Sequence, residues 1–401
     1  KQGRAGPALG MAALGSFIAG TFSLVALMLI APTLASVAIA FGPAEYFSLM
    51  VLGLVVLTFL TQGSMAKALF MACVGVVLGL VGLDSINATP RLTFGHVELI
   101  DGIGLVPVVM GLFGVAEVLI NTEQVLKREI VATKLSNLLP NKEDWKASFG
   151  PIGRGTVLGF FLGILPGGGA VVSSFASYAL EKRLSKTPER FGRGAIEGVA
   201  GPESANNAAA GGAFIPLMTL GIPPNVVMAL LLGAFIIHGL QPGPLMITQN
   251  PALFWGIIAS MYIGNVMLLV LNLPLIGMWV QLLKLPYNVL FPLILLFTII
   301  GVYSSGNNIF DIYVMITFGI IGYFMRKFGY EPAPMVLAFV LGPMLENNLR
   351  KALILSQGDL LTFFQRPISA VCLVLAVLLL IGPLLPSLRQ KRQAVALDSD
   401  N

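Results

Sequence analysis

The sequence predicts an all-α polytopic membrane protein, with about ten to twelve helices that cross the bilayer or enter it half-way. Apolar residues make up 56% of the chain and charged residues only 11%, where a soluble domain has about 25% charged residues. From Gly194 to Leu283 the charged residues are Glu197 and Glu203 alone. In addition, a stretch of 26 uncharged residues, Gly155–Leu180, lies between two basic segments. Together these features indicate a chain that is embedded in a lipid bilayer.

The uncharged stretch predicts a re-entrant hairpin. Leu165-Pro166-Gly167-Gly168-Gly169 interrupts it in the middle, and eleven of the chain's 24 Lys and Arg lie in the segments on either side. Positively charged short loops tend to stay in the cytoplasm, so both flanks are expected there. Irregular backbone inside a bilayer needs protein or a wet cavity around it, and broken helices hold the substrate in secondary transporters. The stretch therefore indicates a transporter.

The remaining elements follow from apolar windows of spanning or half-spanning length. They are expected at Leu9–Ala40 with a break at Pro32, Phe47–Leu60, Ala66–Leu83, Leu105–Ile120, Ala195–Gly221 with breaks at Gly201-Pro202 and Asn206-Asn207, Ile222–Leu240, Leu253–Leu283, Pro286–Val302, Ile309–Met325, Pro334–Leu345 and Pro367–Leu385. The loop and helix-end charges Asp84, Arg91, Asp101 and Glu117 are expected to pair with one another.

Several function classes are disfavoured. The net charge of +5 lies in loops and tails, so it signals orientation in a membrane and not a nucleic-acid surface. Two cysteines far apart in apolar runs, Cys73 and Cys372, predict no disulfide, and two histidines, His96 and His238, predict no metal centre. The sequence contains no His-Glu-x-x-His, Gly-x-Ser-x-Gly or phosphate-binding loop. We therefore expect no enzyme, no ATP-driven pump and no cofactor other than a coupling ion, Na⁺ or H⁺.

The first candidate site is the tip of the hairpin. It comprises Pro166, Gly167, Gly168 and Gly169, followed by Ser173 and Ser174. Glycines expose backbone N–H groups, and the N-terminus of a half-helix adds partial positive charge. These groups would bind a carboxylate without an arginine in the membrane. The alternative is a kinked helix without a ligand.

The second candidate is the small-residue segment from Gly201 to Gly212. Ser204, Asn206 and Asn207 supply hydrogen-bonding groups to a close-packed backbone; asparagine oxygens suit Na⁺, and asparagine amides suit a carboxylate. Glu203 is an ionisable group in an apolar window, and such groups are costly and usually functional. It would take up a proton, bind a cation or cap a half-helix.

The third candidate is Thr219-Leu220-Gly221-Ile222-Pro223-Pro224-Asn225. A glycine followed by two prolines ends one helix and begins another. The functional interpretation is a second broken-helix tip that faces the same cavity and contributes Pro223. The alternative is an ordinary turn outside the membrane.

These segments resemble the large membrane subunit of the tripartite tricarboxylate transporters, the TctA family. The resemblance lies in Gly163–Gly169, Phe191–Gly194 with Glu197-Gly198, Pro202–Gly212, Thr219–Pro223, Asp84 with Arg91–Gly95 and Asp101-Gly102, Gly111–Phe113 with Glu117, and Gln2–Gly10. Leu92 stands where the family usually has Phe. Family members begin roughly a hundred residues earlier, with a first Pro-Gly motif that resembles an inverted-repeat partner of the tip, so we expect a fragment that lacks this region.

The resemblance implies four segments and a set of partners. Residues 1–120 would be the remainder of a first repeat, 121–154 a cytoplasmic amphipathic connector, 155–385 a second repeat with the re-entrant hairpin and a broken helix, and 386–401 a polar cytoplasmic tail. Such a subunit works in the bacterial inner membrane with a small four-helix membrane subunit, a periplasmic solute-binding protein, a carboxylate substrate and membrane lipid. An elevator-like secondary transporter would result.

The function expected from this reading is ion-gradient-driven import of tricarboxylates or related small carboxylates. The substrate residues would be those of the three candidate sites, and Glu203, Asn206 and Asn207 would couple the ion. The alternative is an ion or anion channel built from the same broken helices. A channel would conduct without a binding protein.

Overall fold

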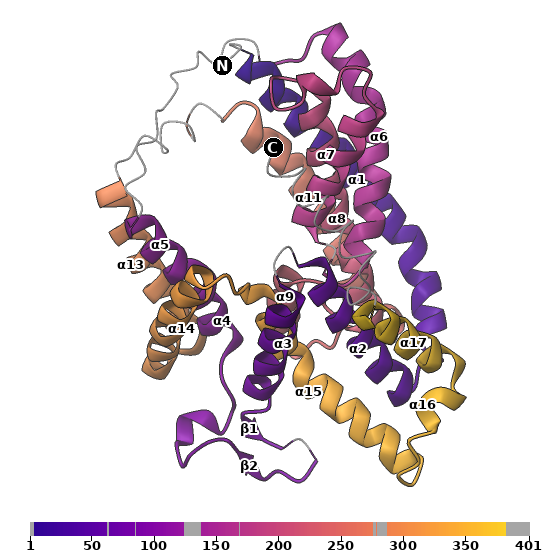
Figure 1. Ribbon diagram of the computed structural model, residues 1–401, viewed down its shortest axis with the longest axis vertical. Helices are drawn as coiled ribbons and strands as arrows, with labels where there is room; N and C mark the ends of the chain where they lie inside the picture. Colours follow the sequence, from indigo (N-terminus) through magenta and orange to yellow (C-terminus); the bar gives the residue numbers. More distant parts are fainter. Residues whose placement is uncertain are drawn as a thin grey trace. The chain divides into compact units, whose positions relative to one another are not determined.

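The computed structural model describes residues 4–61, 64–84, 86–123, 138–167, 169–275, 278 and 287–381, and most of these are helical (Figure 1). Six described helices are long and apolar enough to cross a membrane, at Ala5–Ala38, Pro43–Leu60, Leu105–Glu123, Pro251–Asn272, Val289–Gly306 and Ile309–Lys327. Shorter apolar helices lie at Met65–Gly79, Val226–Ile237 and Pro367–Ile381. The all-α polytopic prediction is confirmed.

The chain forms two compact units, which are described one at a time. Unit 1 comprises Lys1–Ile39 and Lys127–Leu290, and unit 2 comprises Ala40–Leu126 and Phe291–Asn401. Each unit thus takes segments from both expected repeats. A compact unit and a sequence repeat are different things, so the four-segment division stays a prediction. Residues 124–137 of the expected connector and the tail 386–401 lie outside the described residues.

Unit 1 is a bundle around one central helix. Its elements are α1 (Ala5–Ala38), α6 (Lys142–Ile164), α7 (Ala170–Leu184), the 3-10 turn η3 (Pro188–Arg190), α8 (Glu197–Leu220), α9 (Val226–Ile237), α10 (Met246–Gln249) and α11 (Pro251–Asn272). Helix α8 packs against α1, α6 and α7, and α1 also packs against α11 (Figure 1). Leu27, Phe160, Ile215 and Phe254 belong to the buried apolar core that joins α1, α6, α8 and α11.

Small residues bring α6 and α8 into backbone contact. Gly155, Gly159 and Gly163 recur every fourth residue and therefore share one face of α6. A Cβ atom on any of them would collide with the backbone of Gly201, Ala205 and Ala209 of α8, respectively. Close approach through small residues is the usual way in which membrane helices associate. This contact fixes α8, which carries the second candidate site.

Three expectations about the elements are corrected. Helix α1 continues through Pro32, and α8 continues through Pro202 and the Asn206-Asn207 pair, so neither is broken at these points. Prolines are tolerated inside membrane helices because neighbouring groups and local adjustments satisfy the freed backbone carbonyls. Helix α6 also begins at Lys142, because Asn141 and Asp144 form a capping box there. Residues 142–154 of the expected connector are therefore part of the hairpin's first helix.

Unit 2 contains the remaining helices and a two-stranded sheet. Its elements are α2 (Pro43–Leu60), α3 (Met65–Gly79), β1 (Gly82–Leu83), β2 (Pro90–Arg91), the 3-10 turn η1 (Val97–Leu99), α4 (Leu105–Val109), the π-helical turn η2 (Met110–Val115), α5 (Ala116–Glu123), α13 (Tyr287–Gly306, in this unit from Phe291), α14 (Ile309–Lys327), α15 (Pro332–Leu355), α16 (Thr362–Gln365) and α17 (Pro367–Ile381). Helix α15 packs on α3, α17 on α2, and α14 on η2 and its flanking helices. The strands β1 and β2 are antiparallel.

Four charged residues tie the loop after α3 to α15. Arg350 Nη1 lies 2.6 Å from Asp84 Oδ2, and Arg91 Nη1 lies 2.7 Å from Glu346 Oε1. The network closes through Arg350–Glu346 at 3.2 Å and Arg91–Asp84 at 3.4 Å. The expected pairing of Asp84 with Arg91 is thus present, whereas Glu117 pairs with Arg326. Glu346 was not predicted as a member of this network.

Candidate functional site

Two chain tips meet in unit 1. The first, Leu165–Gly169, connects α6 to α7, and the second, Gly221–Asn225, connects α8 to α9. The backbone N–H of Gly167 donates a hydrogen bond to the backbone carbonyl of Pro224, with an N···O distance of 2.8 Å. We call these two segments the joined tips. The first and third predicted site segments are therefore neighbours in space, although more than fifty residues separate them in sequence.

The backbone at the joined tips places two helix N-termini close by. Gly167 and Gly169 have φ angles of +77° and +28°, a region that side-chain-bearing residues rarely adopt. Gly169 is the N-cap of α7. Asn225 is the N-cap of α9, and its side-chain oxygen accepts the N–H of Met228 at 3.0 Å. The N-termini of α7 and α9 carry partial positive charge, so this arrangement favours an anion.

The other residues of the first and third segments support the tips. Ser173 is completely buried, and its hydroxyl donates to the carbonyl of Gly169 at 2.8 Å. The Ser174 hydroxyl lies 3.0 Å from the carbonyl of Ala170 and 3.3 Å from that of Pro202 in α8. Pro223 is buried within the second tip, and Pro166 is half-buried. Gly168 lies outside the described residues.

A cavity of about 280 Å³, with both polar and apolar residues in its lining, lies between α1, α8 and α11. Glu203 and Asn207 line it from α8, Ser16 from α1, and Asn265 and Asn272 from α11. We call it the α1–α8–α11 cavity. The rest of its wall is apolar, formed by Leu9, Ala12, Ala13, Phe17, Leu268 and Leu269.

The second predicted segment divides between this cavity and the helix contacts. Asn207 Nδ2 donates to Ser16 Oγ at 2.7 Å and to the backbone carbonyl of Glu203 at 3.2 Å. Asn206 is half-buried and is not among the residues that line the cavity. Ser204 is fully buried against Gly15 of α1, and its hydroxyl has no hydrogen-bond partner within the described part of the chain.

Three polar residues of the cavity were not predicted: Ser16, Asn265 and Asn272. Asn265 is buried, and its Nδ2 donates to the carbonyl of Phe17 and to Thr21 Oγ1, both at 3.0 Å. These bonds fix α11 against α1. In the sequence, the sign of such a residue is a single amide side chain in an otherwise apolar window, as at Asn265. This sign does not tell which distant helix the amide will contact.

The cavity and the joined tips are linked through α7 and α8. The Ser174 hydroxyl of α7 contacts the carbonyl of Pro202, which directly precedes the cavity residue Glu203. The structure thus places the described residues of the first and third segments at or next to the joined tips. Of the second segment, Glu203 and Asn207 line the cavity, whereas Ser204 and Asn206 do not.

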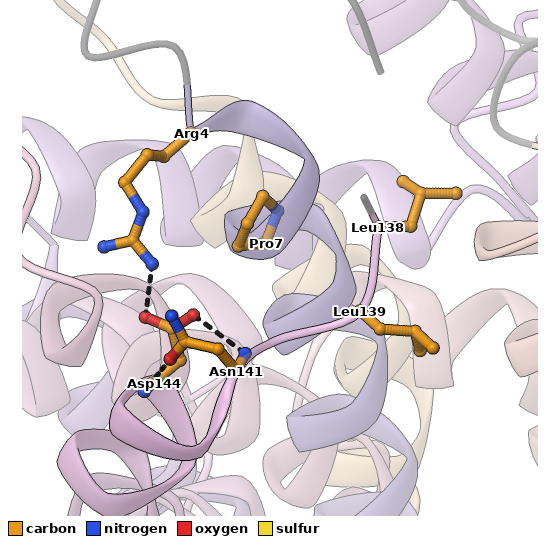
Figure 2. Close-up of a pocket in the computed structure, with 6 residues that line it drawn as sticks. All are labelled: Arg4, Pro7, Leu138, Leu139, Asn141 and Asp144. Carbon is orange, nitrogen blue, oxygen red and sulfur yellow. Dashed lines mark hydrogen bonds and ion pairs between the residues drawn. The ribbon is translucent and has the colours of Figure 1, made fainter. Parts of the chain in front are cut away.

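A larger cleft, of about 410 Å³, lies at the starts of α1 and α6 (Figure 2). Its polar groups bind one another: Arg4 Nη2 lies 2.5 Å from Asp144 Oδ1, and the backbone N–H of Asn141 lies 3.1 Å from Asp144 Oδ2. Figure 2 shows Leu138 and Leu139 along the opposite wall. These contacts start α6 and tie it to α1, so the cleft has a structural explanation.

Comparison with models of known protein families identifies one family. The family model described as "Tripartite tricarboxylate transporter TctA family" matches residues 1–337. Because this match begins at residue 1, it gives no support to the expectation that the family's first hundred residues are absent.

Two relatives come from Agrobacterium vitis. The "Uncharacterized 52.8 kDa protein in TAR-I ttuC' 3'region" is 54% identical over 400 residues, which cover 100% of this chain and 80% of the relative. The "Uncharacterized protein in TAR-II ttuC' 3'region" is 60% identical over 242 residues, which cover 60% of this chain and 100% of the relative. No solved structure matches.

Proposed function

The chain belongs to the tripartite tricarboxylate transporter TctA family, and from this premise we propose that it is the permease subunit of an ion-gradient-driven carboxylate importer in the bacterial inner membrane. The family is one of transporter components and not of enzymes, and the chain is a multi-pass membrane protein. The proposed substrates are tricarboxylates or related small carboxylates. The proposed partners are a small four-helix membrane subunit and a periplasmic solute-binding protein that delivers the substrate.

One observation carries the proposal: the hydrogen bond from Gly167 to Pro224, which holds two chain tips together. The N-termini of α7 and α9 follow directly after these tips. A carboxylate at this position would receive backbone N–H donors and the positive ends of two helix dipoles. Discontinuous helices arranged in this way hold substrate carboxylates in other secondary transporters. The substrate therefore needs no cationic side chain within the membrane.

The ion gradient would act through the neighbouring cavity. Glu203, Asn206 and Asn207 are the proposed coupling residues, and Glu203 and Asn207 line the α1–α8–α11 cavity. The contact between Ser174 and the Pro202 carbonyl gives the joined tips a direct connection to this helix. Binding at one site would then bias the other, as coupling requires.

The test is uptake of labelled carboxylates into vesicles that contain the chain, the small membrane subunit and the binding protein. We expect saturable uptake that requires the binding protein and an ion gradient. Asn206→Ala/Asn207→Ala should abolish uptake while the protein remains in the membrane. Conductance without the binding protein, and no saturable uptake, would replace the transporter with the channel alternative.

A further inference from the structure

The α1–α8–α11 cavity presents oxygen atoms and a single ionisable group. Of the described residues that line it, Glu203 alone carries a charge, and Ser16, Asn207, Asn265 and Asn272 are neutral and polar. No lysine, arginine or histidine is among these described lining residues. A carboxylate substrate would meet an unpaired negative charge here, so this cavity is unsuited to the substrate and suited to a cation.

Hydrogen bonds fix the orientation of the Asn207 amide. Its Nδ2 donates to the backbone carbonyl of Glu203, and a backbone carbonyl can only accept. The same nitrogen donates to Ser16 Oγ at 2.7 Å. Nitrogen and oxygen therefore cannot be exchanged at this side chain. With its donor group occupied, Asn207 offers its Oδ1 oxygen to a ligand.

The third wall of the cavity is fixed in the same manner. Asn265 donates to the carbonyl of Phe17, which settles the orientation of this amide too. Its oxygen lies beside Gly20, where a Cβ atom would come within 2.7 Å of it. Asn265 therefore acts as a positioning residue that holds α11 against α1 at the wall of the cavity.

The charge and volume of the cavity indicate the type of cation. One carboxylate balances one positive charge, whereas Ca²⁺ sites recruit several oxygen ligands rich in carboxylates. Liquid water occupies about 30 Å³ per molecule, so a cavity of about 280 Å³ holds an ion that keeps several waters. Ionisable groups within membrane segments typically mark ion pathways.

We propose that the α1–α8–α11 cavity binds a monovalent metal cation, coordinated by the Glu203 carboxylate, Asn207 Oδ1 and Ser16 Oγ. The remaining ligands are waters. This proposal deepens the proposed function, on which it rests, because the cation is then the ion that drives uptake. It adds Ser16 of α1 to a coupling site that otherwise consists of residues of α8.

The test measures thermal unfolding of the purified full chain in detergent, with Na⁺, Li⁺, K⁺ or choline added at constant ionic strength. We expect at least one of the metal ions to raise the unfolding temperature saturably, and choline not to. Such a shift follows when a ligand binds only the folded state. Equal shifts with choline and every metal ion would overturn the proposal, as would tighter binding of Ca²⁺ or Mg²⁺.

Variants connect the effect to the cavity. Asn207→Ala and Glu203→Gln should raise the half-saturating cation concentration by roughly tenfold or more, equivalent to about 1.4 kcal/mol of binding free energy. Ser16→Ala, the smallest change, should raise the half-saturating cation concentration as well. It provides the test if the other two variants do not fold. Ser260→Ala, at an exposed position of the same α11, is the matched control and should behave as wild type. Unchanged cation response in all three cavity variants would overturn the proposal.

The result separates this inference from the proposed function. A cation-specific shift without any carboxylate uptake supports the cavity and removes the transport proposal. Binding-protein-dependent uptake without a cation-specific shift supports transport and removes the cation site, and coupling then passes to protonation of Glu203.

Discussion

Gly167 is the residue on which the joined tips depend most. Its φ of +77° is open to glycine at no steric cost, and its N–H makes the bond to the Pro224 carbonyl. An alanine would keep the N–H but lose the favoured backbone geometry. A proline would lose both, because its ring fixes φ near −65° and removes the donor.

We expect Gly167→Ala to destabilise the tip by about 1–2 kcal/mol, the cost of a left-handed conformation for an L-residue. Gly167→Pro should abolish substrate uptake. Gly153→Ala is the matched control, since Gly153 lies within helix α6 and a Cβ there meets no described atom within 4 Å. Normal uptake by Gly167→Pro, measured in the vesicle assay, would remove the tips from the mechanism.

Asp84 predicts a pH dependence of stability. It accepts the backbone N–H of Asn87, the side chain of Arg350 and the backbone N–H of Ile86, and these bonds lower the pKa of its carboxyl group well below the ordinary value. A folded-state pKa below the unfolded one contributes stability above the unfolded pKa, about 3.9, and this stability is lost as the pH falls.

Asp84→Asn should therefore unfold at a lower temperature than wild type at neutral pH, and the difference should shrink on acidification from about pH 5 towards about pH 2. Thermal unfolding in detergent at several pH values measures this. A difference that stays constant with pH would mean that ionisation of Asp84 does not stabilise the loop.

At the residue scale, the sequence singled out two polar residues of the cavity but did not predict which residues they would contact. Glu203 and Asn207 were recognisable as costly polar residues in an apolar window. Ser16, the partner of Asn207, lies 191 positions away from it, and a lone serine in an apolar helix gives no sign of such a contact. Ser173 was expected to contact substrate, but the structure buries its hydroxyl inside the turn that starts α7.

At the scale of elements, the contact between α6 and α8 determines where the site residues lie. Gly159 is at the middle of the small-residue face, and a Cβ there would run into the backbone of Ala205. No flexible side chain is present to move aside. The two helices must therefore separate if this position carries a larger residue.

Gly159→Leu should lower the free energy of unfolding of unit 1 by about 1–3 kcal/mol, the usual cost of overpacking. Gly153→Leu, on an exposed face of the same helix, should change stability little. Thermal unfolding of the two variants in the same detergent makes the comparison. Equal stability would show that α6 and α8 do not depend on this close contact.

The elements also show why the predicted breaks differ in outcome. Pro32 and Pro202 interrupt the sequence pattern but not the helices, because neighbouring groups and local adjustments in a membrane helix satisfy the carbonyls that a proline frees. Leu165–Gly169 does end a helix, because Gly167 and Gly169 adopt positive φ, which no continuous helix contains. A proline joined to several glycines was therefore the stronger signal.

At the scale of the whole molecule, one prediction concerns the side of the membrane on which the two ends of the α6–α7 hairpin lie. The basic residues at and beyond the two ends of the α6–α7 hairpin are expected on the cytoplasmic side, so the hairpin is expected to enter and leave the bilayer on one face. The elevator motion and the inverted repeats stay predictions that depend on this arrangement.

Single cysteines at Lys146 and Lys186, both exposed positions, test the sidedness after Cys73 and Cys372 are replaced. A membrane-impermeant thiol reagent should label both from the cytoplasmic side alone. Labelling of the two positions from opposite sides would mean that α6 and α7 together cross the membrane once, and the re-entrant interpretation would fail.

The central claim is that the carboxylate binds at the joined tips, and protection of a cysteine there tests it most directly. Ala170 is the first residue of α7, so the thiol of Ala170→Cys would lie beside the proposed anion, in a chain without the native cysteines. We predict that citrate or a related substrate slows alkylation of this thiol saturably, while alkylation at the exposed Lys186→Cys stays unchanged. Equal alkylation rates at Ala170→Cys with and without saturating substrate, in vesicles that take the substrate up, would contradict the account.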